Sequence, residues 1–322
     1  MVHLVDPCAL PTDQAEQILS TLPPSSFAFA YGSAIIPQCN ADPRRRMIDL
    51  IVAVDDAQQW HSHNLYRNQH HYSMTAQLLG ASTVVKLQRA GAAVYFNTLL
   101  TPGRTPFKYG VVCTADLIDD LTEWHSLYVS GRLQKPVRVL ATAGPLLSKA
   151  LRRNTEAAAA AALLTLPESF GEEALYTAIA SLSYTRDVRT ATAVEVKTKV
   201  YDIVHANLNA FRTMYSSCDS VTELVRGRVW RRDTCAHAQR RLLDRLPARI
   251  RHRVTNHLAV DQRDLPYVHR GRLGSAVLAA VGSVVARSSV SQAVKGIASA
   301  GLTTSFRYVA SKLAKSLNAT WR

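Results

Sequence analysis

The chain changes character near residue 140, and this change limits the folds that it can adopt. Before that point, short runs rich in Val, Ile, Phe and Tyr are each bounded by Gly, Pro, Asn or Asp, which is typical of buried strands. The four runs are 27–31, 47–54, 91–100 and 109–114. The segments 56–79 and 116–132 have helical spacing instead. Strands that alternate with helices predict a layered α/β domain, which we expect to cover residues 1–145.

After residue 145 the chain is expected to be helical. Six consecutive alanines, 157–162, lie in an apolar segment, and alanine has the highest helix propensity. Helical patterns follow at 172–182 and, as one helix, at 197–214. The expected fold class is therefore α+β, with a helical second domain over residues 146–265 and a basic C-terminal segment over 266–322.

Composition excludes several classes of protein. Of the 322 residues, 47% are hydrophobic and 19% are charged, whereas a disordered chain has fewer apolar and more charged residues. The five cysteines are an odd, scattered set without a C-x-x-C pair, which disfavours a disulfide scaffold and a zinc knuckle. The apolar stretch 273–286 contains Gly and Ser and is shorter than the roughly 18–20 residues of a membrane-spanning helix. We therefore expect no membrane span.

Positive charge is concentrated in two blocks. The chain has 38 Lys and Arg against 24 Asp and Glu, a formal net charge of +14. Residues 265–322 contain eight Lys and Arg and no acidic residue, and residues 226–253 contain ten arginines against two aspartates. Such blocks attract anionic polymers or anionic lipid surfaces. For the block 226–253, an ordinary solvated helix face is an equally good interpretation.

The end of the chain has the pattern of an amphipathic helix. At 100° per residue, five apolar side chains fall within about 60° of Phe306: Val309, Ala310, Leu313, Leu317 and Trp321. Arg307, Lys312 and Lys315 lie outside that arc. A narrow apolar face with flanking Lys and Arg suits a membrane interface, although a terminal helix packed on its own protein would show a similar pattern. The absence of acidic residues favours the membrane.

Tyr31, Gly32, Ser33 and Asp49 form the clearest local pattern for chemistry. In nucleotidyltransferases of the polymerase-beta type, a Gly-Ser turn at a strand end presents backbone N–H groups to a triphosphate. The next strand then carries carboxylates that hold Mg²⁺. Gly permits close approach of the backbone, the amides of the turn bind anions, and a hard cation requires oxygen ligands.

The second carboxylate of that pattern is missing. Two carboxylates two residues apart on a strand face the same way, but the residue two after Asp49 is Ile51. Asp55 has the right parity and lies about 20 Å further along an extended strand. The candidates to complete the metal site are therefore Asp55, Asp56, Asp116, Asp119 and Asp120.

The chain also carries a series of short sequences in a characteristic order. In the first half they are Tyr-Gly-Ser (31–33), Met-Ile-Asp-Leu-Ile (47–51), Trp-His-Ser-His-Asn-Leu (60–65), Lys-Tyr-Gly-Val-Val (108–112) and Leu-Tyr-Val-Ser-Gly-Arg-Leu-Gln-Lys-Pro-Val (127–137). Later ones are Leu-Pro-Glu-Ser-Phe (166–170), Leu-Ser-Tyr-Thr-Arg-Asp-Val-Arg (182–189), Lys-Thr-Lys-Val (197–200) and Ala-Gly-Leu-Thr-Thr-Ser-Phe-Arg (300–307). Apart from a divergent stretch around 216–265, nearly the whole chain resembles the mitochondrial translocator assembly and maintenance protein family, the matrix-side CDP-diacylglycerol synthases.

The resemblance implies a fold, a reaction and a location. The fold would be a polymerase-beta-like nucleotidyltransferase α/β domain, a winged-helix-like helical domain and a C-terminal amphipathic helix. The reaction would convert CTP and phosphatidic acid into CDP-diacylglycerol and pyrophosphate with Mg²⁺, and would feed cardiolipin and phosphatidylglycerol synthesis. The protein would lie peripherally on the matrix side of the mitochondrial inner membrane, bound to anionic lipid through its last helix. The partners implied are CTP, phosphatidic acid and a second copy of the chain in a homo-oligomer, and no nucleic acid partner is expected.

The resemblance also implies roles for individual residues. The residues expected to bind the nucleotide are Tyr31, Gly32, Ser33, His61 and Lys197. The residues expected to bind phosphatidate are Asp187, Arg189 and Lys199. Asp49, Asp55 and Lys108 are expected to be catalytic, with Asp49 and Asp55 as the ligands of Mg²⁺. Arg186 departs from the family pattern, which usually has Gly in the Ser-Tyr-x-Gly-Asp turn.

Two other functions fit part of the sequence. A nucleotidyltransferase acting on RNA would explain the first half and the block 226–253, but it would not need the apolar arc at the C-terminus, and no RNP-like aromatic motif is present. A non-catalytic membrane scaffold that supports protein import would explain the C-terminus and leave Asp49 without a role. The histidines at 61, 63, 70 and 71 have no cysteine or carboxylate partner in the pattern, so zinc is not expected there.

Overall fold

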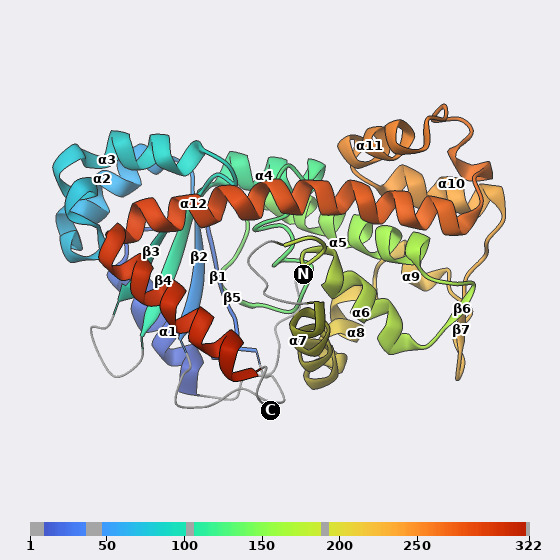
Figure 1. The fold of residues 1–322 in the computed structure, drawn as a ribbon, viewed down its shortest axis with the longest axis horizontal. Helices are drawn as coiled ribbons and strands as arrows, with labels where there is room; N and C mark the ends of the chain where they lie inside the picture. Colours follow the sequence, from blue (N-terminus) through green and yellow to red (C-terminus); the bar gives the residue numbers. More distant parts are fainter. Residues whose placement is uncertain (1–9, 37–46, 101–105, 188–192, 320–322) are drawn as a thin grey trace.

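The computed structural model describes residues 10–36, 47–100, 106–187 and 193–319. Its centre is a five-stranded mixed sheet in the order β3-β4-β2-β1-β5 (Figure 1). The strands are β1 (Phe27–Tyr31), β2 (Ile48–Val54), β3 (Val94–Leu100), β4 (Phe107–Cys113) and β5 (Arg138–Ala141). β2 and β4 are parallel, and the other neighbouring pairs are antiparallel. The α+β class and the four predicted strands are confirmed, while β5 was not predicted.

Helices surround the sheet and make up the rest of the chain. Those of the first part are α1 (Leu10–Thr21), α2 (Ala57–Arg67), the 3-10 turn η2 (Gln69–His71), α3 (Met74–Arg89) and α4 (Thr114–Glu123). The later ones are α5 (Pro145–Thr165), α6 (Glu172–Leu182), α7 (Ala193–Ala206), α8 (Leu208–Tyr215), α9 (Asp219–Thr222), α10 (Ala236–Arg245), α11 (Ala248–Leu258), the 3-10 turn η3 (Leu265–Tyr267) and α12 (Arg270–Ala319). A two-stranded ribbon joins β6 (Ser169–Phe170) to β7 (Trp230–Arg231).

Three predicted helices have different limits in the structure. The segment 56–79 is divided, because Ser73 caps a new helix by accepting a hydrogen bond from the Ala76 N–H. The segment 116–132 stops being helical at Trp124, whose φ of 53° is left-handed. The segment 197–214 is two helices, interrupted at Asn207. Turn chemistry of single residues overrides helical periodicity in each case.

The sheet has two different faces, because successive side chains of a strand point in opposite directions. On one face, Phe29 and Ile51 pack against α4, α5 and the chain between α4 and β5. On the other face, Leu50 and Tyr109 pack against α1 and α2. The neighbouring residues Lys108 and Tyr109 therefore belong to opposite sides of β4, a difference on which the site depends.

α5 is the centre of the helical part. All six alanines of 157–162 are at most 1% exposed, and their small side chains allow α6, α10 and α12 to approach closely. At Gly274 of α12 a Cβ would lie 2.9 Å from the Leu164 carbonyl oxygen, which is tighter than ordinary contact. The alanine run therefore forms a packed core and is not a low-complexity linker.

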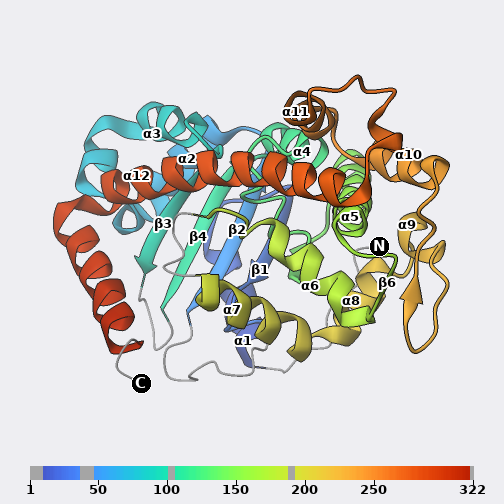
Figure 2. The same cartoon turned by 45° about the vertical axis from the view of Figure 1, so that its right-hand side comes forward.

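α12 is one helix of 50 residues that runs along both parts of the molecule (Figures 1 and 2). Within it, 270–293 is long and apolar enough to cross a membrane by length and composition, but 61% of that window is buried inside the protein. Its packing on α5 and α11 accounts for this apolar character. The side chains of 306–321, on which the predicted amphipathic pattern depends, lie outside the described part of the structure. The domain limits at 145 and 265 stay predictions.

Candidate functional site

Three of the predicted site residues lie side by side on neighbouring strands. Tyr31 of β1 is paired in register with Asp49 of β2, and Asp49 is paired with Lys108 of β4. Gly32 follows with a left-handed φ of 84°, and a Cβ there would lie only 2.4 Å from Asp49 Oδ2. Only glycine fits this turn, so the backbone after β1 lies directly against the Asp49 carboxylate.

Lys108 and Asp49 form the charged centre of this row. The Lys108 Nζ lies 2.8 Å from Asp49 Oδ1, and the side chains are 28% and 15% exposed. Burial disfavours the charged form of Lys108, but the neighbouring Tyr31 and Asp49 outweigh it and raise the pKa of the ammonium group. Burial also raises the pKa of Tyr31, against the opposing effect of Arg132 and Lys108. The row therefore carries a fixed positive charge next to one carboxylate.

The chain between α4 and β5 brings two more cations over the row. The Arg132 guanidinium lies 4.0 Å from the centroid of the Tyr128 ring and 5.1 Å from that of Tyr31. Lys135 Nζ donates to Ser183 Oγ at 2.7 Å and lies 5.1 Å from the Tyr184 ring centroid. Burial, Arg132 and Lys199 together lower the pKa of Lys135 to about 7.

Lys199 of α7 approaches the same tyrosine. Its Nζ lies 5.2 Å from the Tyr184 ring centroid, so two ammonium groups share one ring. Like charges placed together at a partly buried site repel each other, and a bound anion would remove that repulsion. Lys108, Arg132, Lys135 and Lys199 thus form a series of neighbouring cations, with Asp49 as the carboxylate paired to Lys108. This excess of positive charge is suited to phosphate groups.

Asp120 holds the chain that carries Arg132. It is 7% exposed, and its carboxylate accepts five hydrogen bonds. Oδ1 accepts from Ser126 N (2.7 Å), Ser126 Oγ (2.9 Å) and Leu127 N (3.1 Å), and Oδ2 accepts from Ser130 N (3.1 Å) and Ser130 Oγ (2.8 Å). Leu127 has a left-handed φ of 53°, so this loop depends on the bonds that Asp120 accepts. Asp120 is therefore occupied structurally and is not a free metal ligand.

The sequence did not single out Arg132 and Lys135 as site residues. Both lie in the quoted run 127–137, and 116–132 was expected to be a helix, which would have placed Arg132 elsewhere. The signal that could have found them is the pair of cations three residues apart in a run that contains Ser, Gly and Pro and is therefore unsuited to a helix.

Other predicted residues are not brought to the row. Asp55 follows the end of β2 and Asp49 is its second residue, so about 20 Å of strand separates them and they cannot share one ion. Hydrogen bonds from Ser26 and Thr114 lower the pKa of Asp55. Lys197 is exposed on α7, and Arg189 lies outside the described residues.

Asp187 and Arg186 lie in the turn after α6. Asp187 is 7% exposed and its N–H donates to the Tyr184 carbonyl at 3.2 Å, so it belongs to the same turn as the ring shared by the two lysines. Arg186 has a left-handed φ of 58°, the conformation for which glycine is favoured. The departure from glycine at this position therefore places a strained arginine beside the cationic region. A Cβ at Gly282 of α12 would lie 3.0 Å from Arg186 Cδ, so α12 covers this turn closely.

His61 was expected to bind the nucleotide, but it belongs to the opposite face of the sheet from Asp49, in the cluster of Tyr109. It is 0% exposed, and its ring nitrogens lie 2.8 Å from the Tyr72 hydroxyl and 2.9 Å from Gln88 Oε1. The hydroxyl of Tyr109 accepts from Asn64 at 2.7 Å and lies 2.9 Å from His71 Nδ1. Burial lowers the pKa of both histidines to about 4, so both are neutral at pH 7. These histidines are part of a buried neutral network.

Zinc was not expected at the histidines. Within the described ranges, no group of three His, Cys, Asp or Glu side chains is placed to hold a metal ion. A Mg²⁺ ion bound through a nucleotide needs fewer protein ligands, since one or two carboxylates and the phosphate oxygens are enough. Asp49, against which the Gly32 backbone is pressed, fits that requirement as a single carboxylate.

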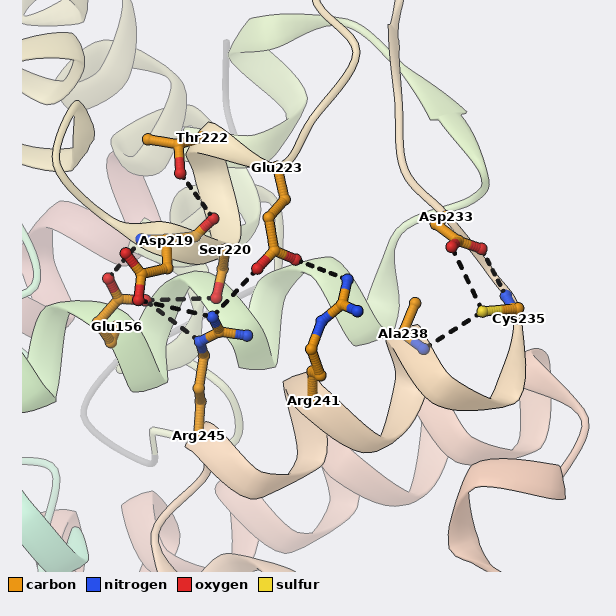
Figure 3. A network of polar contacts seen from close by, with 10 residues as sticks. All are labelled: Glu156, Asp219, Ser220, Thr222, Glu223, Asp233, Cys235, Ala238, Arg241 and Arg245. Atoms are coloured by element: carbon orange, nitrogen blue, oxygen red, sulfur yellow. Dashed lines mark hydrogen bonds and ion pairs between the residues drawn. The ribbon is translucent and has the colours of Figure 1, made fainter.

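The arginine-rich block 226–253 is largely satisfied by its own protein (Figure 3). Arg245 of α10 lies 3.7 Å from Glu156 of α5, 3.7 Å from Asp219 and 3.3 Å from Glu223. Arg241 lies 2.9 Å from Glu223 as well. Other arginines of the block donate to backbone carbonyls: Arg226 to Val221, Arg232 to Leu166, and Arg251 to Asp244. This favours a structural role for the block over a nucleic acid surface.

The fold and the site together describe an α+β protein with a cationic region on one face of its sheet. The family model described as "Phosphatidate cytidylyltransferase, mitochondrial" matches residues 15–315. A relative of that name from Bos taurus is 39% identical over 316 residues, covering 93% of each chain. Similar relatives of the same name are 39% identical in Danio rerio, with 90% of each chain covered, and 37% identical in Xenopus laevis, with 96% covered. The chain therefore belongs to the mitochondrial phosphatidate cytidylyltransferase family, as the sequence resemblance implied.

Proposed function

We propose that this chain transfers the cytidylyl group of CTP to phosphatidic acid and releases CDP-diacylglycerol and pyrophosphate. It is similar over almost its whole length to relatives named for that activity. The observation that carries the proposal is the row Tyr31–Asp49–Lys108 beneath Arg132. It combines one carboxylate, an anion-binding turn and several cations, and the reaction must bring two anions together.

The chemistry is an in-line displacement at the α-phosphorus of CTP. An oxygen of the lipid phosphate forms the new P–O bond while the bond from the α-phosphorus to the bridging oxygen breaks, and that electron pair leaves with pyrophosphate. The lipid phosphate is already anionic near neutral pH, so little general base catalysis is required. The protein must supply position and neutralisation of charge.

We assign each residue to one of the two substrates according to its position in the cationic region. The turn at Gly32 and Ser33 has backbone N–H groups suited to the triphosphate, and Lys108 and Arg132 lie beside it as cations that stabilise the charge on pyrophosphate. Lys135 and Lys199, further toward α7, are the cations that we assign to the incoming lipid phosphate. Asp187 lies in the turn beside them, and Arg189 follows it in the chain.

We propose Asp49 as the residue that holds Mg²⁺ together with the triphosphate. When bound, the ion neutralises phosphate oxygens and stabilises the leaving pyrophosphate. Asp49 has the oxygen ligands that a hard cation needs, and Lys108 is placed to pair with a phosphate once Asp49 binds the ion. Asp55 is not assigned to this role because of its distance along β2.

We further propose a peripheral location on the matrix side of the mitochondrial inner membrane. The relatives' names include the word mitochondrial, and the apolar arc and basic residues of 306–322 suit an anionic lipid surface. In this proposal the first half of α12 packs in the protein and its last turns bind lipid. Deleting residues 303–322 should then weaken binding to anionic vesicles far more than binding of CTP. Equal vesicle binding by the shortened protein would contradict the assignment.

The decisive experiment is CTP turnover by the purified protein with Mg²⁺, with and without phosphatidic acid in mixed micelles. We expect pyrophosphate release that requires phosphatidic acid, with CDP-diacylglycerol as the lipid product. CTP binding without release would redirect the proposal to another acceptor such as RNA. Neither binding nor release would favour a non-catalytic scaffold, the alternative that leaves Asp49 without a role.

A further inference from the structure

The hairpin of α2 and α3 exposes an unusual concentration of large apolar side chains. Tyr66, Met74, Leu78 and Leu79 are 92%, 85%, 86% and 59% exposed. They lie within 14 residues, whereas the other exposed large apolar side chains of the described residues are scattered over the helical part. Single exposed apolar residues are normal on a protein surface, but a cluster of them indicates an interaction site.

The backbone presents this cluster as a projecting short helix. Gly80 has a left-handed φ of 76° inside α3, and nothing lies within 4 Å of the position its Cβ would take. The part of α3 after it is packed, with Ala81 and Val84 buried. The part before it is held by Gln77, whose amide donates to the carbonyls of Gln69 (3.0 Å) and Tyr72 (2.8 Å). Met74 and Leu78, one turn apart, are therefore held on the same side of a fixed helical turn.

The charge around the cluster favours an anionic lipid surface. From residue 57 to residue 115 the sequence contains no Asp or Glu. Arg67 and Lys86 are exposed on the same two helices. An apolar surface on a segment that carries basic and no acidic residues is the combination that binds the interface of an anionic bilayer. A protein that bound here would itself need an apolar surface with acidic groups around it.

The position of the hairpin agrees with this partner. In Figures 1 and 2, α2 and α3 lie at the same end of the molecule as the second half of α12, which turns there and runs down along the sheet. Lys295 of α12 connects the two, because its Nζ donates to the Gln88 carbonyl of α3 at 2.9 Å. Ser291 of α12 also meets Gly91 so closely that a Cβ at Gly91 would lie 1.8 Å from its Oγ. α12 and the hairpin are thus joined at one end of the protein.

We infer that the α2–α3 hairpin is a second membrane-contacting surface, which inserts Met74 and Leu78 into the interface of an anionic phospholipid bilayer. It is separate from the last turns of α12, and its apolar side chains are described directly by the structure. The choice of lipid as the partner rests on the proposed function, in which the acceptor substrate is a membrane lipid. Two contacts at one end of the protein would limit its rotation on the bilayer.

The first test measures binding of the full chain to vesicles of phosphatidylcholine and phosphatidylglycerol in equal proportion, without CTP. The double variant Met74→Ser/Leu78→Ser should bind at least about tenfold more weakly than the unchanged protein, because two apolar side chains no longer enter the interface. Leu146→Ser is the matched control, since Leu146 is 77% exposed on α5, and its binding should be unchanged. The replaced side chains are exposed, so the variants are expected to fold, which circular dichroism checks.

The second test detects contact of the hairpin with lipid directly. It is decisive when the last turns of α12 contribute most of the affinity for vesicles, because the first test would then show little change. A tryptophan at Leu78 (Leu78→Trp) should be quenched by vesicles that contain brominated acyl chains, beyond the quenching seen in the unchanged protein, while Leu146→Trp should show no additional quenching. Absence of additional quenching for Leu78→Trp would overturn the inference. So would a dimer of the unchanged protein that the double variant abolishes, because the occupant would then be a second copy of the chain. Neither readout uses turnover, so failure here is distinguishable from failure of the proposed activity.

Discussion

The two faces of the sheet carry two polar clusters of different kinds, and they begin at adjacent residues of β4. Lys108 points to the face of Asp49 and Arg132, and Tyr109 points to the face of His61 and Asn64. The cluster behind the sheet is neutral, and its members satisfy one another by hydrogen bonds between 2.7 and 3.0 Å. The cluster in front is charged, with more cations than acids.

The difference shows how to separate structure from function in one protein. A buried neutral network in which donors and acceptors match gains stability and needs no ligand. A group of cations that share tyrosine rings and one carboxylate is costly by itself and is stabilised by an added anion. The cluster in front is therefore the one to which we assign the proposed function, and changes in the two clusters should affect different properties.

The largest effect is expected at the centre of the front cluster. Asp49→Asn keeps the shape of the side chain and removes the charge that would hold Mg²⁺. We expect CTP turnover to fall about a hundredfold to a thousandfold, with the thermal unfolding midpoint nearly unchanged. Pyrophosphate release measures the first quantity and calorimetry the second. Turnover within a few-fold of the unchanged protein would show that Asp49 does not act in the reaction.

A smaller effect is expected at Asp120, which does not belong to the front cluster but positions the loop that carries Arg132. Asp120→Asn weakens the bonds to Ser126 and Ser130, so Arg132 should be placed less accurately. We expect kcat/KM for CTP to fall roughly tenfold to a hundredfold.

Asp119→Asn is the matched control, since Asp119 is exposed and adjacent in sequence, and its kinetics should be unchanged. Asp120→Asn also lowers stability, so it changes two properties at once. Arg132→Lys changes the cation itself and leaves Asp120 intact, and it therefore serves as a second comparison. If Asp120→Asn lowers only the unfolding midpoint, its role is structural alone.

A few-fold effect is expected from the pH dependence of Lys135. The pKa of its ammonium group is about 7, so the free protein loses this cation as the pH rises through 7. The KM for phosphatidic acid, whose phosphate we assign to Lys135, should therefore increase from pH 6 to pH 8. Lys135→Arg stays charged, so its KM should increase less over the same range. The comparison between the two proteins removes the titration of the substrates themselves, and parallel profiles would contradict the role of Lys135.

The back cluster should affect stability without affecting turnover. His61→Ala removes one hydrogen-bond partner from the Tyr72 hydroxyl and one from Gln88 Oε1 in a fully buried place. Because two buried polar groups each lose a hydrogen bond, we expect the free energy of unfolding to fall by about 2 kcal/mol, measured with urea, while turnover at low temperature stays the same. A loss of turnover in folded protein would mean that the two faces of the sheet are coupled.

The two neutral histidines of the back cluster also predict that the unchanged protein is less stable in acid. The pKa of His61 and His71 is about 4 in the folded protein against 6.5 as the ordinary value. Since the unfolded chain binds protons first, their contribution to stability is complete above pH 6.5 and is lost as the pH falls toward 4. Unfolding midpoints measured across this range should fall, and should fall less in a variant that lacks His61.

Local patterns predicted much of the fold and part of the site. Four strands and the helical second part follow from periodicity and composition, and the turn at Gly32 follows from a Gly-Ser pair after a strand. Periodicity failed at Trp124, because a left-handed residue ends α4 there and converts the rest of the predicted helix into the loop of Arg132. It also joined α7 to α8 across Asn207, where the backbone leaves the helical region.

The sequence by itself determined which residues alternate on each strand, and therefore that Asp49 and Ile51 share a face while Asp49 and Leu50 do not. It could not determine which neighbours each face meets, because that depends on packing between segments far apart in the chain. Only the tertiary structure placed Arg132, Lys135 and Lys199 together and moved His61 to the opposite side. The physical reason is that hydrogen bonds accepted by one buried residue, Asp120, decide the path of the loop, and charge repulsion among cations is visible only once that path is known.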